Sequence, residues 1–257
     1  YDYRPEDAVA FEELHHFDRW ALSYLQKVLQ EIHQHYQSYA FHRVYHLIRN
    51  FCSVELSSLY LDVLKDRLYI YAPDSWERKS AQRVLYHLAE ALITSIAPFL
   101  SFTAEEAWEH LRNINPQLSE SVFMHSIPTP REELIDEDLL KDYQLLISLR
   151  EDVMKAIELA RKDKAINHPY EAQVFLWGEG LEGAKKYEDY LKYFFTVSSV
   201  KFEEGGAYRV DGEAVRGIMV GVSKAEGNKC PRCWLYYPQE EFEGEICKRC
   251  ASVLQRI

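Results

Sequence analysis

The chain has 257 residues, 47% of them hydrophobic, and a formal net charge of −11 at neutral pH. This apolar content is typical of a globular protein and excludes an intrinsically disordered chain. No stretch approaches the roughly 18 uninterrupted apolar residues of a membrane-spanning helix, and the polar N-terminus does not resemble a signal peptide. Because the sequence lacks an initiator methionine, we expect it to be an excised fragment or a processed chain.

The net negative charge comes from the first 200 residues. Residues 201–257 contain nine Lys or Arg and nine Asp or Glu, whereas residues 1–200 contain 21 basic and 32 acidic residues. A protein that binds nucleic acid irrespective of sequence needs a broad basic surface that neutralises phosphates. Any RNA contact in the first 200 residues is therefore expected to be confined to local patches.

Helical patterns fill the first two-thirds of the chain, where apolar residues recur every three or four positions. Helices are expected over residues 5–32, 41–64, 76–97, 103–111 and 137–165. Ser75 and Thr103 are the expected N-caps of the third and fourth helices, and Glu106 completes a capping box with Thr103. Pro98 should end the third helix. Residues 122–124 are expected to form a short extended segment.

The pattern changes after residue 168. Strands are expected over 172–177, 197–202 and 215–222, and a helix over 181–195, which together predict a small α/β unit. We therefore predict a mainly α fold in which an antiparallel helical bundle precedes a small α/β unit and a four-cysteine zinc module. The predicted domains are the helical bundle (1–168), the α/β connecting domain (169–226) and the zinc-binding module (227–257).

Four of the five cysteines lie close together near the C-terminus, as the pairs Cys230 and Cys233, and Cys247 and Cys250. The spacing C-x2-C-x13-C-x2-C suits one tetrahedral Zn²⁺, because each short spacer brings two thiolates to the same ion. Four protein ligands leave no position for a catalytic water, so this zinc would be structural. Two disulfides or a redox site are the alternatives, but neither pair lies between a strand and a helix as in a thioredoxin motif. The clustering also favours a reducing compartment.

Two groups of residues are candidate RNA contacts. The first is a stripe at helical spacing, made of His42, Arg43, His46 and Arg49. It is either a face for the RNA backbone or a solvated helix face. The second group lies in the zinc tail and consists of Arg232, Trp234, Lys248 and Arg249. Unpaired bases stack on aromatic rings and guanidinium planes, although Trp234 would alternatively pack the zinc core.

Several sequence blocks resemble a known family. Residues 39–45 (YAFHRVY), 50–58 (NFCSVELSS) and 60–69 (YLDVLKDRLY) closely resemble the anticodon-binding helical domain of bacterial-type isoleucyl-tRNA synthetase. Residues 100–108 and 156–166 continue the match, and 229–234 (KCPRCW) resembles the C-terminal zinc module of that family. The blocks follow in order over nearly the whole chain. One departure is Asn167-His168-Pro169, where the family pattern suggests a Gly-Ser type turn.

The resemblance implies a class I synthetase that activates isoleucine with ATP, transfers it to tRNA(Ile) and clears misloaded valine at an editing domain. Neither the HIGH-type nor the KMSKS-type nucleotide motif of that family occurs here, so the chain is expected to be the C-terminal third and to hold no catalytic residue. ATP and Mg²⁺ would bind only in the missing part. We expect a cytoplasmic monomer that binds one structural Zn²⁺ and tRNA(Ile), and no membrane.

Two other interpretations remain open. One is the equivalent region of a valyl- or leucyl-type synthetase, although the paired C-x-x-C motifs favour the isoleucyl enzyme. The other is a zinc-stabilised scaffold that binds a protein partner and never contacts RNA.

Overall fold

The structure, a computed structural model, describes residues 3–256. These residues form two compact units, one extending to Leu140 and the other beginning at Lys141. The fold is mainly helical with small sheets toward the C-terminus, which confirms the predicted fold class. The division into three domains at residues 168 and 226 stays a prediction. Within the described range, no helix is both long and apolar enough to cross a membrane.

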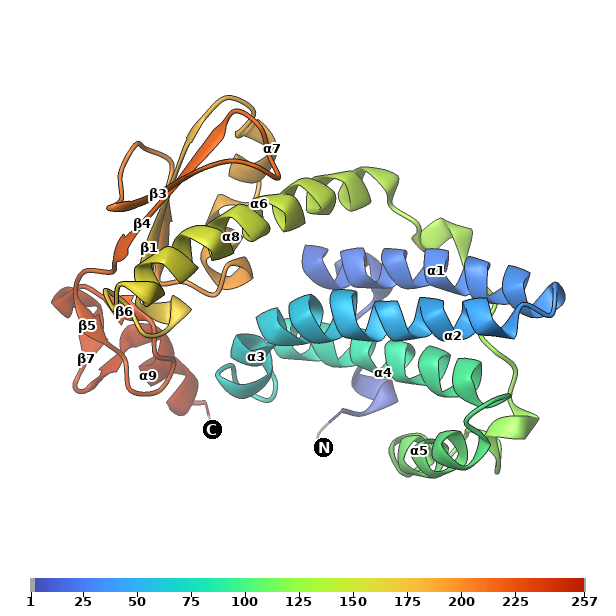
Figure 1. Ribbon diagram of the computed structural model, residues 1–257. Helices are drawn as coiled ribbons and strands as arrows, with labels where there is room; N and C mark the ends of the chain where they lie inside the picture. The colour runs from blue at the N-terminus through green and yellow to red at the C-terminus, as the bar shows by residue number, and fades with distance from the viewer. Residues whose placement is uncertain (1–2, 257) are drawn as a thin grey trace. The chain divides into compact units, whose positions relative to one another are not determined.

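The first unit is a helical bundle. It contains α1 (His16–Gln37), α2 (Phe41–Asn50), α3 (Leu61–Tyr69), α4 (Trp76–Ile96), α5 (Ser101–Ile114) and the first residues of α6 (Glu137–Lys162). Helix α1 packs against both α2 and α4, and α4 packs against α3 and α5 (Figure 1). The buried apolar side chains of α1 recur at helical spacing and are Phe17, Trp20, Ala21, Leu22, Leu25, Val28, Leu29 and Ile32.

The first helix begins later than the apolar period predicts. Pro5–Asp7 (η1) and Phe11–Glu13 (η2) are single 3-10 turns, and α1 begins only at His16. The side chain of His15 caps α1, since its Nδ1 accepts a hydrogen bond from the backbone N–H of Phe17 at 3.1 Å. Burial and the charge of Arg67 lower the pKa of His15 to about 2, so the ring stays neutral and able to accept.

The helix predicted over 41–64 is helical throughout and continues to Tyr69, but it is not α-helical over its whole length. Between α2 and α3 the chain winds as a π-helix, η3 (Phe51–Tyr60). Phe51, Leu56, Leu59 and Tyr60 of this segment are buried. The apolar pattern predicts the helical state of this segment but not its winding.

Two predictions around α4 and α5 have different outcomes. The predicted N-cap of α4 is confirmed, since Ser75 Oγ accepts from the backbone N–H of Arg78 at 3.4 Å. The predicted capping box is wrong, because α5 already begins at Ser101, and Thr103 lies inside the helix.

Residues Val122–Met124 form a 3-10 turn (η4) rather than the predicted extended segment. Ser121 stabilises this turn by accepting a hydrogen bond from the N–H of Phe123 at 3.3 Å.

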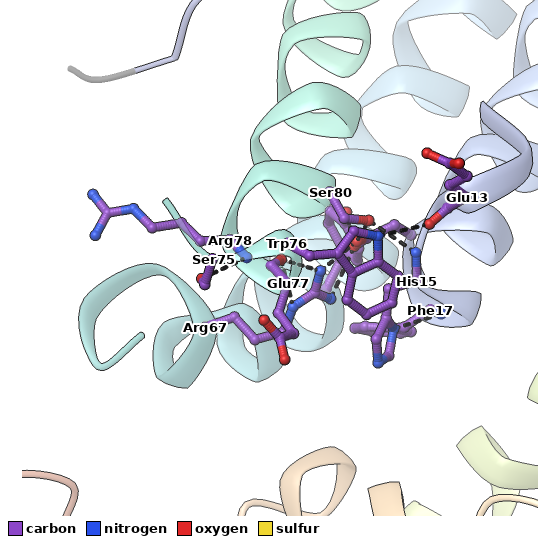
Figure 2. A network of polar contacts seen from close by, with 11 residues as sticks. Glu13, His15, Phe17, Arg67, Ser75, Trp76, Glu77, Arg78 and Ser80 are labelled. Carbon is purple, nitrogen blue, oxygen red and sulfur yellow. Dashed lines mark hydrogen bonds and ion pairs between the residues drawn. The ribbon is translucent and has the colours of Figure 1, made fainter. Parts of the chain in front are cut away.

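A buried polar network connects three helices of the first unit. The carboxylate of Asp18 in α1 is fully buried and forms an ion pair with Arg67 of α3. It also accepts hydrogen bonds from the hydroxyl groups of Tyr60 at 2.7 Å and Ser80 of α4 at 2.5 Å. Arg67 Nε donates to the carbonyl oxygen of Glu77 at 3.0 Å. Figure 2 shows Arg67, Glu77 and Ser80 converging at the start of α4.

The second unit contains most of α6 and a four-stranded sheet. The central strand β1 (Ala172–Gly178) pairs in parallel with β2 (Ser199–Lys201) and antiparallel with β4 (Ile218–Lys224). Strand β3 (Tyr208–Asp211) pairs with the far side of β4, which gives the order β2-β1-β4-β3. The connection from β1 to β2 carries two short helices, α7 (Glu182–Lys185) and α8 (Glu188–Phe194), and the η6 turn (Pro169–Glu171) precedes β1.

Three features of the second unit differ from prediction, besides the shorter strand β2. The helix predicted over 181–195 is divided into α7 and α8, and β3 was not expected because only four residues alternate there. Strand β4 begins at Ile218 rather than at Val215. The backbone N–H groups of Glu213, Ala214 and Val215 instead donate to the buried carboxylate of Asp152 in α6, at 3.1–3.3 Å.

Helix α6 ends three residues before the predicted boundary. Lys164 adopts the left-handed conformation, with φ of 57°. The N–H of Lys164 bonds the carbonyl of Arg161, and the N–H of Ala165 bonds that of Ala160, both at 3.0 Å. These two bonds form a Schellman motif, which ends a helix.

Candidate metal centre and nucleic-acid interface

The chain after residue 227 folds around its cysteines. The strands β5 (Asn228–Lys229) and β6 (Tyr236–Tyr237) pair antiparallel on either side of the first C-x-x-C pair. After the turn η7 (Gln239–Glu241), a second hairpin joins β7 (Phe242–Glu243) to β8 (Ile246–Cys247), and α9 (Lys248–Leu254) follows directly. Gly227 is required where this module begins, because a Cβ there would lie 2.3 Å from the carbonyl oxygen of Tyr237.

The fold brings together the four cysteines that the spacing singled out. Cys230 and Cys233 come from the first hairpin, Cys247 precedes α9 and Cys250 lies in its first turn. All four are buried, and their sulfur atoms lie within 4.8 Å of one another. In the described part of the chain, this is the one group of three or more His, Cys, Asp or Glu residues arranged to hold a metal ion.

The cluster has the dimensions of a tetrahedral zinc site. With Zn–S bonds of about 2.3 Å, tetrahedral geometry places the sulfur atoms about 3.8 Å apart. The Sγ atoms of Cys233 and Cys247 are 3.8 Å apart. Four sulfur donors in a closed shell suit Zn²⁺ and leave no open coordination position.

Backbone hydrogen bonds favour the thiolate of Cys230, whereas burial raises the pKa of Cys247 and of Cys250. Burial raises the pKa of Cys230, but backbone N–H groups of Cys233, Cys247 and Arg232 outweigh this effect and lower the pKa to about 6. The N–H of Cys247 lies 3.4 Å from the sulfur of Cys230. Since zinc binds the deprotonated thiol, donors that stabilise the thiolate also favour metal binding.

The predicted RNA contacts of this module have different degrees of exposure. Trp234 is 52% exposed and Lys248, the first residue of α9, is exposed, so both side chains are available to a partner. Arg232 is half-buried, and its side chain hydrogen-bonds the Cys250 sulfur, which counteracts the rise in the pKa of Cys250 caused by burial. Arg249 is half-buried, with its guanidinium carbon 5.5 Å from the ring centre of Tyr193.

Trp234 has neighbours that sequence reasoning did not identify. Its ring makes an edge contact with the exposed His168, with ring centres 6.3 Å apart, and His168 stacks on Tyr170 at 4.9 Å. The Nζ of Lys229 lies 5.5 Å from the centre of the Trp234 ring. His168 belongs to the tripeptide at which the sequence departs from the family pattern. A surface with the exposed rings of Trp234 and His168, the half-buried ring of Tyr170 and one cation therefore extends from the zinc module to the segment that follows α6.

The other predicted cations lie on α2, in the first unit. All four side chains of the stripe are exposed, namely His42, Arg43, His46 and Arg49. Val44 and Ile48, which lie between them in the sequence, are buried against the bundle. The stripe is therefore a solvent-facing helix surface, and it belongs to a different unit from the cysteine cluster.

Comparison with known proteins assigns the chain to a family. A family model described as the anticodon-binding domain of tRNA ligase matches residues 18–176. The chain belongs to this family. A second model, described as a zinc finger found in FPG and IleRS, matches residues 227–253 and so contains all four clustered cysteines.

The similar proteins are isoleucine–tRNA ligases. The ligase of Aquifex aeolicus (strain VF5) is 56% identical, over 100% of this chain and 27% of the relative. The ligase of Persephonella marina (strain DSM 14350 / EX-H1) is 45% identical, over 98% of this chain and 27% of the relative. The ligase of Sulfurihydrogenibium sp. (strain YO3AOP1) is 45% identical, over 99% of this chain and 28% of the relative. This member of the anticodon-binding family thus spans about a quarter of the length of these relatives, and the resemblance deduced from its motifs is confirmed.

Proposed function

We propose that this chain is the tRNA-recognition part of an isoleucine–tRNA ligase, the class I enzyme that attaches isoleucine to tRNA(Ile) with ATP. The observation that carries the proposal is an exposed tryptophan, Trp234, presented by a four-cysteine knuckle in a chain of the anticodon-binding family. ATP, Mg²⁺ and the chemical steps belong to a part of the enzyme outside these 257 residues. The chain alone is expected to be non-catalytic.

In this proposal one structural Zn²⁺ is held by Cys230, Cys233, Cys247 and Cys250. The metal organises a module of short strands that has little apolar core of its own, and so fixes the position of Trp234 and Lys248. Arg232 acts mainly on the metal site, because a guanidinium beside Cys250 offsets the negative charge of four thiolates. Only its solvent-facing edge would reach RNA.

In this proposal, the candidate RNA contacts of the zinc module and of α2 bind different parts of the tRNA. Trp234 would stack on an unpaired base, since aromatic rings bind the faces of splayed bases. Lys248 and Arg249 would contact phosphates, which position the RNA without reading its sequence. The α2 stripe (His42, Arg43, His46 and Arg49) would provide a second backbone contact, on the bundle.

A titration at two salt concentrations tests whether the chain binds RNA. We expect the affinity of the zinc-loaded chain for a tRNA(Ile) transcript to fall as salt rises, in proportion to its phosphate contacts. Lys248→Ala should weaken binding and lower the slope of log K against log salt by about 1, because one phosphate contact is lost. Lys65→Ala is the matched control, since Lys65 is an exposed lysine paired with Asp62 in the other unit.

The outcome separates RNA recognition from a protein-binding scaffold. A scaffold would show no tRNA binding at either salt concentration, and this result would contradict the proposed function. Equal slopes for Lys248→Ala and the unsubstituted chain would remove Lys248 from the interface while leaving RNA binding in place.

A further inference from the structure

Three exposed aromatic side chains lie at the corner between α1 and α2, and none of them has been given a role. Tyr39 is 80% exposed, Phe41 47% and Tyr45 49%. The ring of Phe41 makes an edge contact with that of Tyr39, with centres 6.2 Å apart. We call Tyr39, Phe41 and Tyr45 the corner patch. Large apolar rings that face water in a folded domain often mark a binding surface.

The backbone at Tyr39 is the first independent observation. Tyr39 has a φ of 57°, in the left-handed region. Its N–H bonds the carbonyl of Tyr36 at 3.0 Å, and the N–H of Ala40 bonds that of His35 at 2.8 Å. These bonds form the Schellman motif that ends α1, and they place Tyr39 at the position where glycine is usually found. A side chain kept at such a position, and left exposed, is typical of a functional residue.

The local charge is the second observation. Residues 32–54 contain no Asp or Glu, although the chain has 41 acidic residues. The stripe residues Arg43 and Arg49 lie within this segment and are exposed. Among the described residues, neither forms an ion pair with a carboxylate. The corner is therefore a local positively charged surface on an acidic unit, and this surface is available to an anionic partner.

We propose that the corner patch is a stacking platform for an unpaired base of RNA, with the adjacent cations of α2 bound to the flanking phosphates. This inference rests on the proposed function and adds a residue-level role, since it makes the α1–α2 corner a site that binds bases as well as backbone. Aromatic rings beside free guanidinium groups are the combination with which proteins hold single-stranded nucleic acid. Of the three rings, that of Tyr39 is the most exposed, and it is therefore the ring that would contact the base.

The position of Tyr39 allows a test in which stability and binding change differently. Tyr39→Gly removes the ring and places the preferred residue in the left-handed turn, so thermal stability should be unchanged or higher. The affinity for a tRNA(Ile) transcript should nevertheless fall by about 5- to 150-fold, the range found when one stacked base loses its aromatic partner. Tyr39→Phe should retain most of the affinity, because the ring face remains.

Two controls separate stacking from other effects. Tyr69→Ala removes another tyrosine of similar exposure, 75%, from α3, where Asp62 and Asp66 lie nearby in the sequence, and should leave the affinity unchanged. A fully paired RNA duplex offers no unpaired base, so Tyr39→Gly should bind it as the unsubstituted chain does. Arg43→Gln should weaken the binding of both RNAs, because it removes a phosphate contact.

The outcomes separate the stacking role of the corner patch from the proposed function in tRNA recognition. If Arg43→Gln weakens tRNA binding and Tyr39→Gly does not, the stacking platform is refuted while the proposed function stands. The corner patch would then be a surface for a protein partner. Equal weakening of duplex and tRNA binding by Tyr39→Gly would also refute base stacking. If the unsubstituted chain does not bind tRNA, both claims fail.

Discussion

Trp234 is held in a backbone conformation that usually selects glycine. Its φ is 67°, and its N–H bonds the carbonyl oxygen of Cys230 at 2.9 Å, which closes the first metal knuckle. A left-handed conformation costs a bulky residue of the order of 1 kcal/mol relative to glycine. With 52% of its surface exposed, the ring recovers only part of this cost by packing. This balance favours a role in recognition over a role in the zinc core.

The substitution Trp234→Gly tests this interpretation of the residue. The zinc content and the stability of the module should be maintained, because glycine suits the turn and the four ligands are untouched. Loss of one stacked base should weaken tRNA(Ile) binding by about 5- to 150-fold. The measurement pairs metal analysis with an RNA titration. If Trp234 only packs the module, the zinc content would fall and any loss of RNA binding would follow that fall.

Single residues differ in how well their roles can be predicted from sequence. The spacing of the cysteines was sufficient to select the cluster, because two short spacers and one long linker constrain the four sulfurs directly. The half-buried state of Arg232 could not be predicted, since it depends on the position of Cys250, eighteen residues away. Left-handed backbone at Tyr39, Lys164 and Trp234 was also missed, because these residue types rarely adopt it.

At the scale of elements, the register of α1, α3 and α4 depends on the carboxylate of Asp18. Its oxygens accept from Tyr60, Arg67 and Ser80, and its exposed fraction is 0%. The backbone N–H of His15 in turn donates to Ser80 Oγ at 2.9 Å, and the indole of Trp76 donates to the Glu13 carbonyl at 2.8 Å (Figure 2). The start of α1 is thereby tied to the start of α4.

Asp18→Ala should destabilise the first unit strongly. Removing one partner of a buried ion pair leaves the other charge without compensation in a nonpolar environment, at a cost of about 3–5 kcal/mol. Arg67 would lose its carboxylate while its guanidinium stayed buried. Chemical denaturation followed by helical circular dichroism measures the loss. Asp62→Ala, which removes a partly exposed carboxylate paired with Lys65, is the control and should change stability by less than about 1 kcal/mol. A similar small effect for Asp18→Ala would contradict the structural role of the network.

Apolar periodicity was sufficient to locate the helices but not their boundaries or winding. The spacing of three and four predicts α1, α2 and α4 because each helix buries one face. It does not reveal that Asp18 pairs with Arg67 and Ser80, since these residues are 49 and 62 positions away in the sequence. The π-helical segment and the late start of β4 depend likewise on packing and on the hydrogen bonds to Asp152, which are tertiary contacts.

At the scale of the molecule, the first unit and the module after residue 227 should respond differently to loss of zinc. The first unit has a core of buried aliphatic and aromatic residues, whereas the module after residue 227 consists of two-residue strands and one short helix around the cysteines. Structural zinc in small modules contributes about 10–16 kcal/mol of apparent binding free energy.

Chelation of zinc should therefore unfold the module and spare the bundle. Hydrogen exchange should become fast for residues 228–254 and stay slow in α1 and α4, with most helical circular dichroism retained. Cys247→Ser should show the same local loss without chelator, and Cys52→Ser, outside the cluster, should not. Unchanged exchange in the module after complete metal removal would show that zinc does not hold it together.

The proposed function requires that this chain reads the anticodon region of tRNA(Ile). The most direct measurement compares the dissociation constants of the zinc-loaded chain for a tRNA(Ile) transcript and for the same transcript with only its anticodon changed, at one salt concentration. Each lost base contact costs about 1–3 kcal/mol, so the altered transcript should bind at least about fivefold more weakly. Equal dissociation constants for the two transcripts would contradict the claim, because phosphate contacts alone would then account for the binding.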